Sequence, residues 1–76
     1  MTRYANISGN SGVTAFEIQS ESIWVQFRGG PAYLYPSSCI GEGNLQTMCG
    51  LATNGQGLGT FINTNPIVKK GYTLKR

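Results

Sequence analysis

Three short segments in which apolar and polar side chains alternate follow one another in the first half of the chain, at residues 13–18, 23–28 and 32–35. A polar turn that includes Ser20-Glu21 separates the first two segments, and Gly29-Gly30 comes before the third. Alternation with a period of two is typical of strands that bury one face, and paired turn residues are typical of hairpins. The sequence therefore predicts a three-stranded antiparallel meander.

Two-residue loops at Ser20-Glu21 and Gly29-Gly30 set the register that we expect for this meander. The apolar side chains then share one face, and they are Phe16, Ile18, Ile23, Val25, Phe27, Ala32 and Leu34. The other face carries Ala15, Glu17, Trp24, Gln26, Arg28, Tyr33 and Tyr35. Because a slip of one residue would move a whole strand to the opposite face, this sorting supports the register.

A helical pattern begins after Pro36. Ser37 and Ser38 are suitable N-cap residues. Apolar side chains then recur at the spacing i, i+3, i+4 and i+7, at Leu45, Met48, Cys49 and Ala52. Glycines within this segment weaken the helix by ~1 kcal/mol each relative to alanine, so contacts with the sheet must hold it. We expect one main helix at residues 38–55, packed on one face of the sheet.

The two ends of the chain have weaker patterns. Turn formers dominate residues 1–12, so we expect an irregular arm there. Residues 57–76 should form a short helix and a basic tail, and the part after Pro66 fits a second short helix or an added strand equally well. A chain of 76 residues is long enough for one domain. The expected class is α+β, with the meander at 13–35, a main helix on one face and a short C-terminal helix or strand.

The side chains that most often perform catalysis are missing from this sequence. It contains neither His nor Asp, and its acids Glu17, Glu21 and Glu42 fall in different predicted elements. General acid–base chemistry and cysteine nucleophiles both need a suitable base. Cys39 and Cys49 cannot complete a tetrahedral zinc site without His or Asp. We therefore expect a protein that is not an enzyme, with two free thiols, no cofactor or metal and no small-molecule substrate.

Positive charge is concentrated near the C-terminus. The net charge is +3, and four of the six basic residues lie among the last eight positions, at Lys69, Lys70, Lys75 and Arg76. A basic segment suits an anionic partner such as nucleic acid, although a solubilising terminus would have the same composition. The sequence has no apolar run long enough for a signal peptide or a membrane span. We expect a soluble cytoplasmic protein without a membrane partner.

The expected binding residues combine aromatic rings with positive charge. Five of them lie on the second face of the meander, and the set comprises Trp24, Gln26, Arg28, Tyr33, Tyr35, Lys69, Lys70 and Tyr72. Rings beside an arginine on an open sheet are typical of single-stranded nucleic-acid binders. The same residue types are enriched in protein interfaces. Three alternatives stay open: a nucleic-acid platform, an interface with another protein or in a homodimer or larger oligomer, and a face covered by the chain itself.

Three segments in order, VQFRGGPAYLY at 25–35, GLGTFIN at 57–63 and KKGY at 69–72, resemble the KTSC domain family of small bacterial modules. The resemblance spans residues 13–72. It implies a compact α+β module that also occurs as a stand-alone protein, with nucleic acid as the first partner to test. The residues that match the family's motifs are Tyr33, Tyr35, Phe61, Asn63, Lys70 and Tyr72. Gln56 departs from the family, which usually has a basic residue there, and this departure argues against phosphate contacts at that position.

Overall fold

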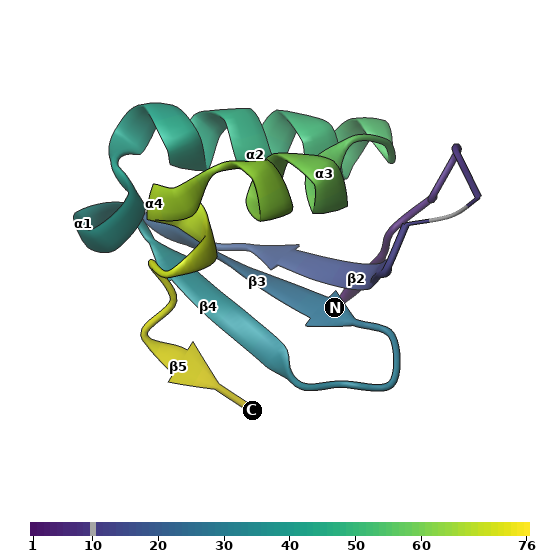
Figure 1. Ribbon diagram of the computed structural model, residues 1–76, viewed down its shortest axis with the longest axis horizontal. Helices are drawn as coiled ribbons and strands as arrows, with labels where there is room; N and C mark the ends of the chain where they lie inside the picture. The colour runs from purple at the N-terminus through teal and green to yellow at the C-terminus, as the bar shows by residue number, and fades with distance from the viewer. Residues whose placement is uncertain (10) are drawn as a thin grey trace.

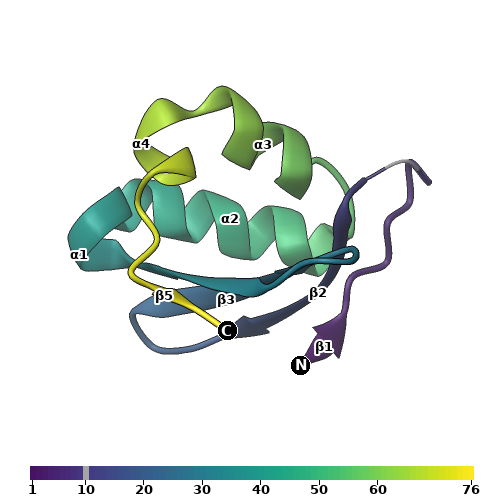
Figure 2. The same ribbon diagram turned by 60° about the horizontal axis from the view of Figure 1, so that its bottom comes forward.

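The computed structural model describes residues 1–9 and 11–76 as an antiparallel sheet with helices packed on one face (Figures 1 and 2). Within the described part of the chain, five strands lie in chain order across the sheet: β1 (Thr2–Arg3), β2 (Val13–Ile18), β3 (Ser22–Phe27), β4 (Ala32–Pro36) and β5 (Leu74–Lys75). The helices are α1 (Ser37–Ile40), α2 (Glu42–Asn54), α3 (Leu58–Thr64) and α4 (Pro66–Lys69). The α+β class is confirmed, and the expected count of three strands was too low because β1 and β5 extend the two edges.

The hairpin of β2 and β3 has the predicted register. Phe16 lies opposite Val25, and Ile18 lies opposite Ile23. The backbone N–H of Gln19 donates to the carbonyl oxygen of Ser22 at 2.9 Å, which closes a loop of two residues. A short loop of this kind matches the twist of the flanking strands and leaves little freedom for slippage.

A bulge near the start of β2 changes one side-chain direction. The register shifts between Val13 and Ala15, so that Val13 pairs with Phe27 and Ala15 pairs with Gln26. A bulge inserts one extra residue into a strand and so reverses the alternation beyond it. Val13 is therefore completely buried and belongs to the core beneath the helices.

The hairpin of β3 and β4 differs from the predicted register by one residue. Tyr33 lies opposite Val25, and Trp24 lies opposite Leu34. The N–H of Gly30 donates to the carbonyl oxygen of Phe27 at 3.2 Å. The pairing of Phe27 with Pro31 leaves a loop of three residues, 28–30, instead of two. The slip turns the whole of β4 over, because side chains alternate along a strand.

The two faces of the sheet therefore carry different residues from those expected. Tyr33 and Tyr35 join Ile23 and Val25 on the face beneath the helices, which we call the inner face. The opposite face, which we call the open face, carries Trp24 and Gln26 from β3 and Ala32 and Leu34 from β4. Figure 2 shows that the helices of the described chain lie on the inner face alone.

Gly41 divides the predicted helix at 38–55 into α1 and α2. Its φ of +89° and ψ of 149° lie outside helical geometry, in a region that favours glycine. Within α2, Leu45, Met48 and Ala52 are buried, as their helical spacing predicts. Complete burial of a large aliphatic side chain contributes ~1.5–3 kcal/mol, so this stripe stabilises α2 despite its glycines. The left-handed Gly55 (φ +77°) then ends the helix.

The N-terminal arm is more ordered than expected. Thr2–Arg3 pairs with Ala15 and Phe16 of β2. Tyr4 is 2% exposed, and its hydroxyl accepts a hydrogen bond of 3.2 Å from the backbone N–H of Leu58 at the start of α3. The arm therefore links the edge of the sheet to the helical layer.

The C-terminal segment forms both a second short helix and an added strand, the two alternatives that the sequence left open. The helix α4 is capped by the side chain of Asn65, which accepts from the backbone N–H groups of Ile67 and Val68. Val68 is completely buried and anchors this helix to the core. The chain then returns to the sheet, where β5 pairs with β4. No helix in the described part of the chain is long and apolar enough to cross a membrane.

Candidate functional site

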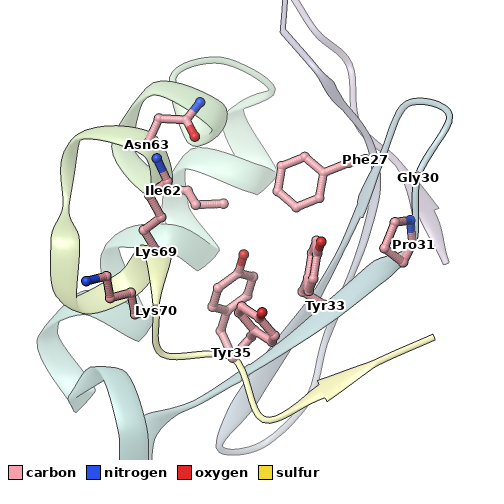
Figure 3. Close-up of a pocket in the computed structure, with 10 residues that line it drawn as sticks. Phe27, Gly30, Pro31, Tyr33, Tyr35, Ile62, Asn63, Lys69 and Lys70 are labelled. Carbon is pink, nitrogen blue, oxygen red and sulfur yellow. The ribbon is translucent and has the colours of Figure 1, made fainter.

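A cleft of about 800 Å³ opens on the inner side of the molecule, between the β3–β4 hairpin and the helices α3 and α4 (Figure 3). Its lining residues are Phe27, Gly30, Pro31, Tyr33, Tyr35, Ile62, Asn63, Lys69, Lys70 and Tyr72. The volume lies within the range of small-molecule and cofactor sites, roughly 300–1,000 Å³. We call this site the aromatic cleft.

Three aromatic rings gather around that of Tyr33. Its ring centroid lies 4.6 Å from that of Tyr72, 5.6 Å from Phe27 and 6.5 Å from Tyr35. Tilted and edge-to-face pairs at such distances stabilise by ~0.5–1.5 kcal/mol each beyond their buried area. The register of β4 creates this cluster, because it places Tyr33 and Tyr35 on the same face as Phe27.

Tyr72 comes from the connection between α4 and β5, and backbone hydrogen bonds on both sides hold it in place. The N–H of Gly71 donates to the carbonyl oxygen of Val68 at 3.0 Å, and the N–H of Thr73 donates to that of Leu34 at 3.0 Å. Gly71 also permits a close approach, since a Cβ there would lie 2.5 Å from Ile40 Cγ2. The connection is therefore pressed against the helices, and it forms one wall of the cleft.

The charge of the aromatic cleft is exclusively positive. Lys69 and Lys70 are exposed at its helical side, and none of the ten lining residues is acidic. Figure 3 places Asn63 and Lys69 on the helical side, across the cavity from Phe27 and Tyr33. This arrangement combines flat apolar surfaces, hydroxyl and amide groups and two ammonium groups, which together suit an anionic ligand with a flat ring.

Burial raises the pKa of Tyr35 from 10.0 to about 12, and the neighbouring Tyr33 and Tyr72 contribute further to the increase. Desolvation disfavours the phenolate, and nearby phenolates would repel it. The hydroxyl of Tyr35 therefore stays neutral at physiological pH. A neutral hydroxyl can donate a hydrogen bond to a ligand as well as accept one.

Five of the eight predicted binding residues line the aromatic cleft: Tyr33, Tyr35, Lys69, Lys70 and Tyr72. The other three are Trp24, Gln26 and Arg28, and none of them lines it. The expected platform, with Trp24 beside Tyr33 and Tyr35 on one face, was wrong because the three-residue loop turns β4 over.

The chain itself engages these three residues. The guanidinium of Arg76 lies over the Trp24 ring, 4.0 Å from its centroid. The amide of Gln26 donates to the carbonyl oxygen of Gly30 at 2.6 Å and so supports the hairpin loop. Arg28 donates to the carbonyl oxygen of Ser11 at 3.4 Å. Cover by the C-terminal tail, one of the three alternatives for the second face, therefore applies to Trp24.

Sequence reasoning did not place Phe27, Ile62 or Asn63 in the site. Phe27 and Ile62 belong to apolar patterns that predict a core, and both do contact the core. Asn63 was singled out by the family resemblance alone. Only the pairing of distant segments brings the three residues to one cavity.

The described residues contain no group of three or more His, Cys, Asp or Glu side chains that could hold a metal ion. The two cysteines are free thiols, exposed at Cys39 and half-buried at Cys49. Burial and the nearby Glu42 raise the pKa of the Cys49 thiol. Cys49 is therefore a weaker nucleophile at neutral pH than an unperturbed thiol.

Comparison with protein-family models, curated proteins and solved structures finds no match for this chain. The resemblance to the KTSC family and the cytoplasmic location stay predictions.

Proposed function

We propose that the chain is a non-catalytic binding module that holds single-stranded nucleic acid, RNA above all, in the aromatic cleft. The observation that carries this proposal is the meeting of four rings and two lysines in one cavity without an acidic lining residue. Unstacked bases bind aromatic side chains by stacking, and lysines neutralise the phosphates beside them.

The concave shape of the site favours a single strand over a duplex. A base in a duplex is stacked between its neighbours and cannot enter a cavity without being extruded. The rings of Tyr33 and Phe27 lie inside the cleft, whereas Lys69 and Lys70 are exposed at its side. An unpaired base can therefore enter while its phosphate stays beside the lysines.

A binding titration tests the proposal. Fluorescence anisotropy of a labelled single-stranded RNA is measured at low and at moderate salt, with the protein's fold checked by circular dichroism. We expect binding at low salt that weakens as salt rises, because each neutralised phosphate releases counterions. A folded protein that does not bind at low salt would contradict the proposed function.

A charge-matched pair of variants locates the binding site. Lys69→Gln with Lys70→Gln should weaken binding at least ~10-fold. The slope of the logarithm of the binding constant against the logarithm of the salt concentration should become shallower by ~1.4, since each single-strand phosphate contact contributes ~0.7. The control, Arg3→Gln with Arg76→Gln, removes the same charge from the open face. Arg3 pairs with Ala15, and Arg76 pairs with Ala32. This control should bind within about twofold of the wild type, because its loss of long-range attraction is small at moderate salt. Equal losses in the two double variants would mean that net charge, and not the cleft, attracts the RNA.

The open face supports a second candidate function, which is self-association. Leu34 lies opposite both Trp24 and Leu74, and Leu74 is 55% exposed. An apolar row of this kind on a face without helices suits a symmetric contact between two copies. Sedimentation that finds a monomer throughout the micromolar range would contradict this candidate.

A further inference from the structure

Asn63 is the one primary amide among the residues that line the aromatic cleft, and it is exposed. Its side chain makes no hydrogen bond to another described residue, whereas Asn44 and Asn65 both have protein partners. It follows Ile62, which is 3% exposed and fixes this part of α3 against the core. A rigid element therefore presents an amide whose donor and acceptor are both available to a ligand.

The surroundings of this amide are suited to a base. Figure 3 shows Asn63 across the cavity from the rings of Phe27 and Tyr33, with Lys69 beside it on the helical side. A base that stacks on those rings turns an edge toward α3. Its phosphate can then lie near the lysines. Stacking therefore uses the sheet side of the cleft, whereas edge recognition and charge neutralisation use the helical side.

We propose, on the basis of the nucleic-acid binding proposed above, that one unpaired base enters the aromatic cleft and that Asn63 recognises its edge, with adenine preferred. A primary amide offers one donor and one acceptor side by side, and it pairs with a neighbouring acceptor and donor. Adenine presents such a pair through N6 and N7, the partner that asparagine most often binds with two hydrogen bonds. Adenine also presents a second donor and acceptor pair through N6 and N1.

Short RNAs in which one variable central nucleotide is flanked by abasic sugars test this inference. The position is adenine, another base or an abasic sugar, and anisotropy at fixed low salt measures each affinity. We expect the abasic RNA to bind at least ~10-fold more weakly than the adenine RNA, and the other bases to fall between them. Equal binding of the abasic and adenine RNAs would mean that no base enters the cleft.

The variant Asn63→Leu tests the role of the amide while it keeps the charge and approximate size of the side chain. The preference for adenine over the other bases should fall to about twofold or less, whereas the affinity for the abasic RNA should not change. Asn63→Ala, which removes the amide without adding an apolar side chain, should give the same loss of preference. Asn54→Leu, at an exposed position near the end of α2, serves as the matched control and should keep the preference.

Each result separates this inference from the proposed function. Binding without an adenine preference, or a preference that persists in both Asn63 variants, overturns the recognition by Asn63 and leaves nucleic-acid binding intact. If none of the RNAs binds the folded wild-type protein at low salt, both proposals are wrong.

Discussion

The two faces of the sheet both carry aromatic rings near positive charges, but the rings have different surroundings. On the open face, Trp24 is 8% exposed, and the guanidinium of Arg76 lies over its ring at 4.0 Å from the centroid. On the inner face, Tyr33 and its neighbours line a cavity of about 800 Å³. Aromatic and basic composition is therefore a poor guide to a binding site by itself. What distinguishes the two faces is that a cavity opens beside the rings of the inner face.

The largest predicted effect concerns Gly71, which brings the cleft wall against the helices. A Cβ at this position would lie 2.5 Å from Ile40 Cγ2 and 2.7 Å from the carbonyl oxygen of Ile67. We expect Gly71→Ala to reduce the free energy of unfolding by about 3 kcal/mol, the upper end of the usual cost of overpacking. A domain of this size has only ~3–5 kcal/mol in total. Urea denaturation followed by circular dichroism measures the loss.

Gly43→Ala is the matched control for this substitution. Gly43 lies in α2, and a Cβ there meets nothing within 4 Å. Alanine should therefore stabilise the helix by ~0.5–1 kcal/mol. If both variants changed stability by the same amount and sign, the close packing of the Tyr72 segment would not be a feature of the protein in solution.

The second prediction uses the ionisation of Tyr35. The native pKa of about 12 lies above the ordinary 10.0, so between these values the native state keeps a proton that the unfolded state has released. The contribution to stability is fully present below pH 10 and is lost as the pH rises toward about 12. We expect the free energy of unfolding to fall by roughly 2 kcal/mol through this group. Denaturation series below pH 10 and near pH 12 measure the change.

Tyr35→Phe separates this effect from the titration of the other tyrosines. Phenylalanine keeps the ring in the cluster and removes the ionisable hydroxyl. The variant should lose roughly 2 kcal/mol less than the wild type across the same pH interval. An identical loss in the two proteins would show that the burial of Tyr35 does not govern alkaline unfolding.

The two hairpins explain how much of the fold could be predicted from sequence. In the β2–β3 hairpin a slip of one residue would move Phe16 away from the face of Val25 and Ile23, so the apolar pattern and the loop length agree. In β4 the alternation is between Ala32 and Leu34 on one side and two tyrosines on the other. Tyrosine is suited to a buried face as well as to an open one, so the pattern there did not discriminate between registers.

The rest of the difference arises from contacts between distant segments. The strands β1 and β5 have two residues each, which is too short for a periodic pattern, and they form by pairing with β2 and β4. The cleft likewise depends on the return of Tyr72 and the lysines to the hairpin. Sequence reasoning found most of the aromatic and basic residues of the cleft, but it placed two of its tyrosines on the wrong face.

The smallest predicted effect concerns Arg76, and it examines the open face directly. The backbone of Arg76 pairs with Ala32 through hydrogen bonds of 2.8 and 2.9 Å, so Arg76→Gln changes the contact with Trp24 and keeps the strand. We expect a loss of ~0.5–1 kcal/mol, the usual strength of an exposed cation–π contact. Acrylamide should also quench the fluorescence of Trp24, the only tryptophan, more efficiently. Lys75→Gln is the control, because the Nζ of Lys75 lies 5.9 Å from the Tyr33 ring centroid on the other face. It should leave this quenching unchanged.

RNA affinity should stay within about twofold in the Arg76 variant, because the loss of one charge has little effect at moderate salt. A gain in RNA affinity that accompanies the exposure of Trp24 would make the open face the stacking surface and would contradict the distinction between the two faces.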